Sequence, residues 1–261
     1  MPESQVIISP SPAAAAEPFR QILGIRFYVG DLAGLLRLVG QGGLIAVPSA
    51  PVLVGLSGDH ALRTAIEASD FAITDSGFMI VLWRLFQGER LERISGLKLL
   101  SALFRAPGRV SPGTSFWIMP SAHEMAANLA WLKAQGHAVP TESCYIAPHY
   151  PGGSLSDHDL LRQIEAQKPA YVLVNLGGGV QERLGLFLRQ NLSYRPAIIC
   201  TGAAIAFLSR QQANIPPWAD RLMLGWLMRI IYAPGRFLPR YRKALQLVPL
   251  LWKYRGRSVA E

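Results

Sequence analysis

Short apolar runs alternate with helical patterns along most of the chain, and this alternation limits the fold more than any other feature. Seven runs have the length and the Val and Ile content of buried strands: residues 24–29, 44–47, 71–74, 115–119, 144–147, 171–176 and 197–200. Helical patterns lie between them at residues 31–39, 59–68, 78–87, 123–135, 156–167 and 181–190. Strands that alternate with helices indicate βαβ units. The sequence therefore predicts an α/β fold with a Rossmann-like, doubly wound and mostly parallel sheet.

The chain of 261 residues is long enough for one large domain with an appendage. We expect residues 1–18 to form a disordered tail, because Pro interrupts its apolar runs and it lacks the basic leader of a signal peptide. Residues 19–215 are predicted to form the α/β domain, with a loop at residues 105–114 as a candidate boundary between half-domains. Residues 216–261 show no strand pattern and predict a basic helical appendage, broken at Pro234-Gly235 and Pro249.

Positive charge is concentrated near the C-terminus. The formal net charge is +9, and residues 219–261 hold nine Lys or Arg against two acids, a balance of +7 that leaves +2 for the first 218 residues. Such a segment is expected to face a polyanion: phosphate, nucleic acid or anionic lipid. Aromatic side chains interleaved with the cations favour a membrane surface over a packed subdomain with a solvated basic face. No apolar run reaches the ~18 residues that a membrane span needs.

Several residue patterns exclude common kinds of site. Cys144 and Cys200 are too few for a disulfide framework, and their apolar surroundings predict buried thiols in a reducing compartment. The five His residues lack zinc-binding spacing, and no GxSxG or GxGxxG motif is present. Asp157 and Asp159 form a DxD-like triplet at the start of a helical pattern, where helix capping explains them and a metal role is the less favoured alternative. We expect no metal and no cofactor.

Asp75 is the only acid between Phe71 and Phe86, and it stands where a predicted strand gives way to an apolar helical pattern. Ligands of parallel sheets bind at the carboxyl ends of strands, where helix N-termini present unpaired N–H groups. An Asp there can cap the next helix or accept a proton from an attacking hydroxyl. The spacing leaves both roles open.

Three further turns follow predicted strands and are rich in small residues. They lie around Ser49, in the triglycine turn that precedes Gln181 and Glu182, and at Thr201-Gly202. Glycines permit a ligand to approach the backbone closely, although a tight strand-to-helix turn explains them as well. If the strands are parallel, these turns and Asp75 share one edge. The candidate substrate-binding residues are Ser49, Gly177, Gly178, Gln181, Glu182, Thr201 and Gly202.

From about Ile25 to Tyr241 the chain resembles the WecG/TagA/CpsF glycosyltransferase family. The resemblance rests on Asp75-Ser76-Gly77, on Glu92–Gly96, on Leu176–Glu182 and on the C-terminal run that holds Trp226, Arg229, Pro234, Arg236, Arg240 and Tyr241. It implies a metal-independent, inverting transferase that moves an N-acetylmannosamine-type sugar from a UDP donor to a polyprenyl-diphosphate-linked sugar. It also implies a peripheral position on the cytoplasmic face of the membrane, in the assembly of a bacterial surface polysaccharide.

The resemblance also implies roles for individual residues. Asp75 would be the base that deprotonates the acceptor hydroxyl, and Gln181 and the turn at Ser49 would contact substrate. C-terminal arginines would close over the diphosphate, with Arg221, Arg229, Arg236 and Arg240 as candidates. The chain departs from the family pattern at Ser49, Lys98, Pro120-Ser121, Ala206 and Gly225.

These departures keep a second function class open: a membrane-associated protein that binds a UDP-sugar or a polyprenyl phosphate without catalysis. We expect no nucleic-acid partner, because the basic residues are confined to one end and no RNA-binding motif is present. The sequence leaves a homo-oligomeric state open.

Overall fold

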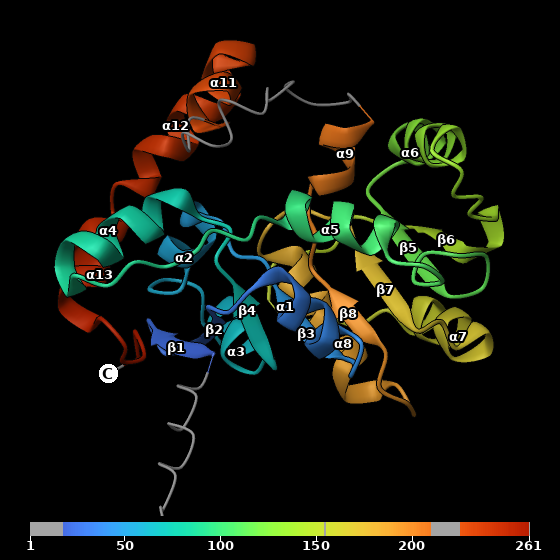
Figure 1. Cartoon of the computed structure of the whole chain (residues 1–261), viewed down its shortest axis with the longest axis horizontal. Coiled ribbons are helices and arrows are strands. Elements are labelled where there is room, and N and C mark those ends of the chain that lie inside the picture. The colour runs from blue at the N-terminus through green and yellow to red at the C-terminus, as the bar shows by residue number, and fades with distance from the viewer. Residues whose placement is uncertain (1–17, 154, 210–224, 261) are drawn as a thin grey trace, which may run out of the picture.

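The computed structural model describes residues 18–153, 155–209 and 225–260. Within these residues an eight-stranded sheet has the order β1-β2-β4-β3-β8-β7-β5-β6 (Figure 1). Every neighbouring pair is parallel except β1 and β2, which are antiparallel. The α/β fold with a mostly parallel sheet is therefore confirmed. The strands are β1 (Phe19–Ile22), β2 (Ile25–Tyr28), β3 (Gly43–Ala46), β4 (Phe71–Ile73), β5 (Ser115–Met119), β6 (Cys144–Ile146), β7 (Tyr171–Val174) and β8 (Ala197–Ile199).

The edge strand β1 is absent from the prediction, which places only residues 24–29 in a strand. It forms a two-residue hairpin with β2, and the turn residues Leu23 and Gly24 both have left-handed backbones, with φ of 53° and 78°. Such turns match the twist of a hairpin. The Leu23 and Gly24 amides donate to the carbonyls of Arg255 and Gly256, at 2.7 and 3.3 Å. The hairpin therefore joins the first strand to the C-terminal end of the chain.

Between residues 18 and 209, the described part of the chain contains the six predicted helices and three further α-helices. Two of these lie between predicted helices and one follows the last of them. The predicted ones are α1 (Leu32–Val39), α3 (His60–Glu67), α4 (Gly77–Gln87), α6 (Ala122–Ala134), α7 (His158–Gln167) and α8 (Val180–Asn191). The additional ones are α2 (Ala50–Gly55), α5 (Gly96–Arg105) and α9 (Ala204–Leu208). The turns before α2 and α9 contain Pro48 and Gly202, which hide the start of each helix, whereas α5 follows the charged segment 89–95.

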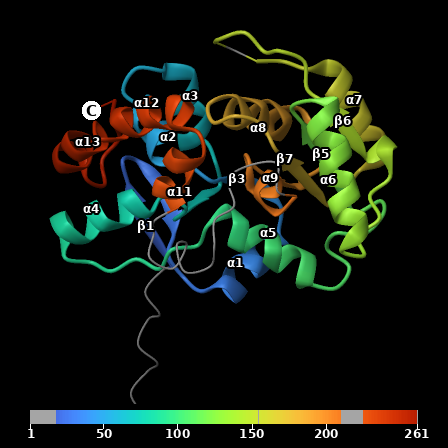
Figure 2. The same cartoon turned by 90° about the horizontal axis from the view of Figure 1, so that it is seen from above.

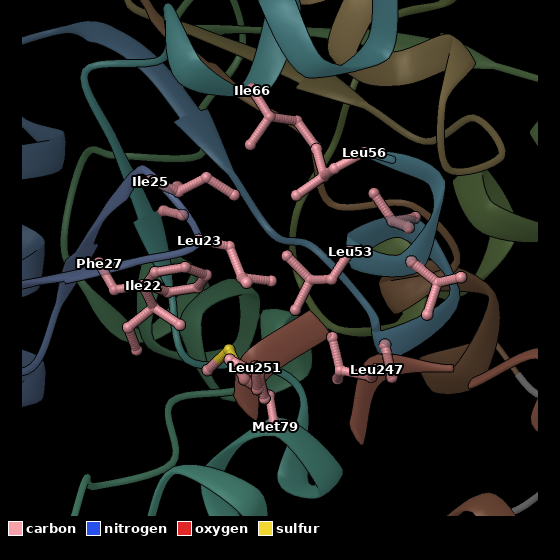
Figure 3. Packing of buried hydrophobic residues seen from close by; sticks show 14 of the residues in the cluster. Ile22, Leu23, Ile25, Phe27, Leu53, Leu56, Ile66, Met79, Leu247 and Leu251 are labelled. Carbon is pink, nitrogen blue, oxygen red and sulfur yellow. The ribbon is translucent and has the colours of Figure 1, made fainter. Parts of the chain in front are cut away.

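Two layers of helices cover the two faces of the sheet. One face carries α2, α3, α4 and α13, and further along the sheet α7 and α8. The core between the first four helices and the sheet includes Ile22, Phe27, Leu53 and Leu251 (Figure 3). The opposite face carries α1, α5, α6 and α9. Cys200 is buried as predicted, whereas Cys144 is only half-buried on the edge strand β6, so the prediction of two buried thiols is wrong for Cys144.

The sheet consists of two halves that meet where β3 pairs with β8. Strands β1 to β4 form one half, and β5 to β8 form the other. Along the strands, the chain passes from the first half to the second once, from α5 to β5, through residues 106–114. The predicted loop at residues 105–114 coincides with this crossing. The C-terminal helices pack on the first half again. The border between halves of a doubly wound sheet is where its ligands bind.

The C-terminal segment forms α11 (Gly225–Tyr232), α12 (Pro234–Ala244) and α13 (Leu247–Tyr254). The predicted break at Pro234 is confirmed. The predicted break at Pro249 is wrong, because Pro249 lies in the first turn of α13, where a backbone N–H would have no intrahelical acceptor. Among the described residues, no helix combines the length and the hydropathy needed to cross a bilayer. Leu247 and Leu251 of α13 are buried in the core, and whether residues 216–261 are a separate unit stays a prediction.

Candidate active site

The predicted site residues follow four strands that are adjacent in the sheet. Asp75 follows β4, Ser49 follows β3, Thr201 follows β8 and Gly177 follows β7, and the sheet order of these strands is β4-β3-β8-β7. All four strands run in the same direction. Because neighbouring strands lie about 4.8 Å apart, the four turns form one continuous edge. The predicted common edge is therefore confirmed.

Asp75 is not the N-cap of the helix that follows it. Ser76 occupies that position, and its hydroxyl accepts a hydrogen bond from the Met79 amide at 3.2 Å. The Asp75 carboxylate instead accepts the Gly96 amide at 3.0 Å through Oδ1, at the first residue of α5. The capping role in α4 is thus wrong, and the carboxylate faces the N-terminus of another helix. Within the described part of the chain, Asp75 Oδ2 accepts no hydrogen bond.

Three hydrogen bonds between side chains and backbone atoms join the segment before α5 to the end of β4. Arg93 Nε donates to the Asp75 carbonyl at 2.9 Å. The Thr74 hydroxyl donates to the Glu92 carbonyl at 2.6 Å and accepts the Ile94 amide at 3.2 Å. These bonds hold the Glu92–Gly96 segment against the end of β4. They therefore place the N-terminus of α5 beside the Asp75 carboxylate.

Gly96 also contacts the turns after β3 and β8. A Cβ on Gly96 would lie 3.1 Å from Val47 Cγ1 and 3.7 Å from the Thr201 carbonyl oxygen. The start of α5 is therefore packed between the turn after β4, which holds Asp75, and the turn after β8. This contact brings Asp75 and Thr201 to the same part of the edge, although β3 lies between the strands that they follow.

Gln181 has an unsatisfied oxygen in a buried polar cluster. The residue is 3% exposed, its Nε2 donates to Glu182 Oε1 at 2.9 Å, and its Oε1 has no hydrogen-bond partner among the described residues. A Cβ on Gly202 would lie 3.5 Å from that Oε1. Nearby, the Thr201 hydroxyl donates to Asn175 Oδ1 at 2.9 Å. A buried acceptor without a donor is costly, and a ligand hydroxyl or N–H would satisfy it.

Both carboxylate oxygens of Glu182 accept hydrogen bonds from the protein itself. Its Oε2 accepts the Gly179 amide at 2.5 Å in a capping box at the start of α8, and its Oε1 accepts from Gln181. It is 1% exposed, and burial raises the pKa of its carboxyl, against the hydrogen bonds from Gln181 and Gly179, which lower it. Glu182 therefore positions Gln181 and the triglycine turn, and its own contact with substrate stays a prediction.

The triglycine turn needs its glycines for packing as well as for access. A Cβ on Gly178 would lie 2.4 Å from Val52 Cγ2 of α2, closer than two carbons can approach. Gly179 has a φ of 93°, a backbone conformation that side chains disfavour. The turn therefore seats α2 directly against the N-terminus of α8. The tight-turn alternative accounts for these two glycines, and it leaves ligand contact at Gly177 and Gly178 untested.

A cavity of about 730 Å³ opens beside this turn. Its walls come from α2, the loop to α3, the triglycine turn, the first turn of α8 and the end of α12. Arg183, Arg240 and Lys243 line it, and the sequence prediction includes only Arg240 among them. Arg240 also reaches the carboxyl edge, because its Nη2 lies 3.4 Å from Ser49 Oγ. Asp75 does not line this cavity.

The structure does not describe the contacts of the other candidate arginines. Arg221 lies outside the described residues, and the side chains of Arg229 and Arg236 also lie outside what the structure describes. Only Arg240 of the four can therefore be assigned contacts. It joins the C-terminal helices to the turn after β3 at Ser49.

The departures from the family pattern have local explanations. Ser121 is the N-cap of α6 and accepts the Glu124 amide at 3.2 Å. Lys98 pairs with Glu92 at 2.9 Å on the surface. Ala206 is 2% exposed inside α9, so this chain presents no side-chain acid there.

The DxD-like triplet is a helix start. Asp157 is the N-cap of α7: its Oδ1 accepts the Leu160 amide at 2.9 Å, and its Oδ2 accepts the hydroxyls of Tyr145 and Tyr150 at 2.9 and 2.6 Å. The capping interpretation is therefore confirmed. Desolvation and the bond to Asp157 raise the pKa of Tyr145 to about 12, so its hydroxyl stays a donor to this carboxylate at neutral pH.

Several large apolar side chains are exposed on the C-terminal helices and on α4. Leu85 is 73% and Val81 50% exposed on α4, so this apolar helix is buried on one side only. Trp252 of α13 is 61% exposed and packs edge-to-face on Phe86 at 5.3 Å, which joins the two helices into one surface. Further exposed apolar residues lie on α11, α12 and the turn after α12: Ile231, Tyr232, Leu238 and Leu245.

The comparison with known protein families agrees with the resemblance read from the sequence. A family model described as Glycosyl transferase WecG/TagA/CpsF family matches residues 20–260. A search of curated proteins finds no significant match. The family match spans the whole sheet, the four turns of the carboxyl edge and the C-terminal helices. The chain belongs to the WecG/TagA/CpsF family of glycosyltransferases.

Proposed function

We propose that this glycosyltransferase moves an N-acetylmannosamine-type sugar from a UDP donor to a polyprenyl-diphosphate-linked sugar, with inversion and without a metal ion. Its family supports a role in cell-surface polysaccharide synthesis. The observation that carries the finer proposal is the Asp75 carboxylate. One of its oxygens is held by the N-terminus of α5, and the other accepts no hydrogen bond from a described residue.

In the proposed reaction, Asp75 accepts the proton of the acceptor hydroxyl as the hydroxyl oxygen attacks the anomeric carbon. The bond from that carbon to the diphosphate oxygen breaks, and its electron pair leaves with UDP. The acceptor oxygen attacks the anomeric carbon from the face opposite to the departing diphosphate, so the configuration at that carbon inverts. Arg240, beside Ser49, would balance the charge that develops on the diphosphate.

The buried cluster after β7 and β8 would hold the donor. The unpartnered Gln181 Oε1 would accept a ligand hydroxyl or N–H beside Thr201 and Gly202. Glu182 would act as a positioning residue, because its Oε1 accepts Gln181 Nε2 and so orients the amide. Ser49 would contact substrate where the family usually has Asn.

A peripheral position on the cytoplasmic face of the membrane belongs to the same proposal. Exposed apolar side chains on α4 and on the C-terminal helices lie among exposed cations that include Arg84, Lys253 and Arg257. Rings and aliphatic groups would enter the headgroup region while cations meet lipid phosphates. A lipid-linked acceptor would then be presented directly to the enzyme.

Release of UDP from a panel of UDP-sugars, with a polyprenyl-diphosphate-linked acceptor, tests the proposal. Asp75→Asn keeps an oxygen for the Gly96 amide but cannot accept the proton, so we expect UDP release to fall by about 10²- to 10⁴-fold. The matched control is Ser76→Ala. It removes the cap of α4 at a cost of about 1 kcal/mol in stability and should keep the activity of the folded protein.

Activity of folded Asp75→Asn at the wild-type rate would disprove the assigned base. The alternative function, a non-catalytic protein that binds a UDP-sugar or polyprenyl phosphate, is favoured by the buried Ala206, where the family usually has an acid. Tight UDP-sugar binding without release of UDP for any donor and acceptor would support that alternative.

A further inference from the structure

The ionised form of Glu182 allows only one orientation of the Gln181 side-chain amide. Both carboxylate oxygens of Glu182 accept hydrogen bonds, Oε2 from the Gly179 amide and Oε1 from Gln181 Nε2. If the Gln181 amide turned over, its oxygen would face a carboxylate oxygen, and two acceptors would meet in a buried place. The carboxylate therefore makes Gln181 direct its own acceptor, Oε1, away from Glu182.

The acceptor Gln181 Oε1 lies near Gly202, in the turn after β8. A Cβ on Gly202 would lie 3.5 Å from Gln181 Oε1 and 3.7 Å from the Leu176 carbonyl oxygen. These are ordinary contact distances, so the glycine leaves room for a small ligand group beside two acceptor oxygens. Gln181 is 3% exposed, and its Oε1 has no hydrogen-bond partner among the described residues. A ligand N–H at this point would make the hydrogen bond that the buried oxygen lacks.

A proton on Glu182 reverses the orientation of the Gln181 amide. Glu182 Oε2 stays an acceptor for the Gly179 amide, so the proton is carried by Oε1, which faces Gln181. The Gln181 oxygen accepts this proton when the amide turns over, and its NH₂ group then points away from Glu182. Gln181 now offers a donor where it had offered an acceptor, and a ligand N–H would meet another N–H.

The charged and titratable neighbours of Glu182 come from three elements. Burial raises the pKa of the Glu182 carboxyl, and the guanidinium of Arg183 lowers it to a smaller extent. The Cys200 thiol donates to the Gln181 carbonyl at 3.4 Å, and burial and then the charge on Glu182 raise its pKa, so it stays a neutral donor. In both views α3 lies beside α8 (Figure 1, Figure 2), and its N-cap Asp59 lies 3.7 Å from Arg183. Neither α2 nor β3 has a titratable side chain.

We propose that Glu182 selects the hydrogen-bond polarity of the donor site: as a carboxylate it makes Gln181 an acceptor for a ligand N–H, and when protonated it makes Gln181 a donor that rejects this group. The inference rests on the proposed function, because a UDP-linked N-acetyl sugar offers such a group in its uracil ring and in its acetamido group. Glu182 is thus a positioning residue that determines specificity through the amide of Gln181.

The test is calorimetric titration of the full chain with UDP-N-acetylmannosamine from about pH 5 to about pH 9. Wild-type affinity should rise as the pH rises through the pKa of Glu182, because only the ionised form presents the acceptor. At the upper end Glu182→Gln should bind at least about tenfold more weakly than wild type, since its own NH₂ faces Gln181 and holds the turned-over amide. At the lower end the two proteins should bind equally, because protonated Glu182 resembles the amide.

The ratio of the two affinities at each pH cancels the ionisation of the ligand itself. The matched control is Glu142→Gln, the same change at an exposed residue that precedes β6. It should bind as wild type does at every pH. Circular dichroism checks that both variants are folded.

UDP and UDP-mannose distinguish the two sources of the N–H group. If the acetamido group meets Gln181, the pH-dependent difference between wild type and Glu182→Gln appears with UDP-N-acetylmannosamine alone. If the uracil ring meets it, the difference appears equally with all three ligands. Either result supports the inference. Equal affinity of wild type and folded Glu182→Gln for all three ligands at every pH would overturn it, and so would a weakening in Glu182→Gln that is the same at every pH.

The titration needs no turnover, so its failure is distinguishable from a failure of the proposed reaction. A pH-dependent difference between wild type and Glu182→Gln, in a protein that transfers no sugar, would support the inference and disprove the transferase proposal. Sugar transfer by a Glu182→Gln protein with unchanged affinity would do the reverse. Failure of wild type to bind any of the three ligands would overturn the proposed donor and this inference with it.

Discussion

The Asp75 carboxylate is where two segments of the chain meet, because it accepts the amide of Gly96, 21 positions away. The N-terminus of a helix stabilises a negative charge beside it. The first turn of α4 has its own cap in Ser76, so the carboxylate is not needed there. The residue types alone could not show which of Asp75 and Ser76 caps α4, since Asp and Ser both favour N-cap positions.

The buried carboxyl group of Glu182 should make the stability of the folded chain depend on pH. Burial raises its pKa in the folded chain, so the folded state binds a proton more tightly than the unfolded chain between the two pKa values. Stability contributed by this group is therefore greatest below the unfolded value and falls as the pH rises through the window between them. The loss is complete above the raised folded-state pKa.

Glu182→Gln should remove this pH dependence, because an amide does not ionise. Its oxygen can still accept the Gly179 amide. Its NH₂ faces Gln181 Nε2, so the Gln181 amide must turn over for its oxygen to accept from the new NH₂. We expect equal or greater stability than wild type at pH 8, measured by urea denaturation at several pH values. Glu182→Ala is the comparison, since it loses the capping box and should be less stable throughout. A pH profile unchanged in Glu182→Gln would contradict the prediction.

At the scale of the element, α13 connects the C-terminal segment to the α/β core. Leu247 and Leu251 are 0% and 1% exposed, and they pack among residues of β1, β2 and α2 in the core that Figure 3 shows. The amides of Leu23 and Gly24 donate to carbonyls just beyond this helix. Deletion of the basic segment would therefore expose the core, and it is a poor test of membrane binding.

Leu251→Ala should destabilise the whole domain by about 2–5 kcal/mol, the usual cost of a cavity in a packed core. Leu245→Ala is the matched control, because the same side chain is 61% exposed at the turn after α12. It should change the free energy of unfolding by less than about 0.5 kcal/mol. Chemical denaturation followed by circular dichroism measures both. Equal stability of the two variants would mean that α13 does not contribute to the core.

At the scale of the whole molecule, apolar and basic groups share one end. The exposed residues Leu85 and Trp252 lie there with the basic C-terminal helices, while the first 218 residues carry a formal charge of only +2. An anionic membrane would attract such a surface at long range and bury its apolar groups at contact. The two contributions differ in their response to salt.

Binding to vesicles that contain anionic lipid should weaken as NaCl is raised from about 0.1 to 1 M, because the Debye length falls from about 10 to 3 Å. Leu85→Ser should weaken binding about tenfold at either salt concentration, since it removes buried apolar area. Vesicle co-sedimentation measures both effects.

Ile146→Ser is the matched control for Leu85→Ser. Ile146 is 43% exposed on β6, the strand at the opposite edge of the sheet from β1. Its substitution should leave vesicle binding unchanged. If Leu85→Ser and Ile146→Ser behave alike, α4 is not part of the membrane surface.

The sequence by itself determined the layered α/β fold, because strand and helix periodicities are local properties of adjacent residues. It also located the four turns of the carboxyl edge, since a parallel sheet places all its strand ends on one side. The edge strand β1 escaped prediction because a hairpin with one strand of mixed polarity has a weak pattern. The exposure of Val81 and Leu85 on α4 could not be predicted, because an exposed apolar patch has the same composition as a buried core.

Only the tertiary structure decided which residues of that edge lie together. The Gly96 amide reaches Asp75, Gln181 Oε1 is left without a donor, and Arg240 reaches Ser49 from 191 positions away. Only the tertiary structure shows that Arg183 and Lys243 line the same cavity. The physical reason is that these relations depend on the strand order and on the packing of α5, α8 and α12. Contacts between distant segments are set by the global fold, and no local pattern in the chain encodes them.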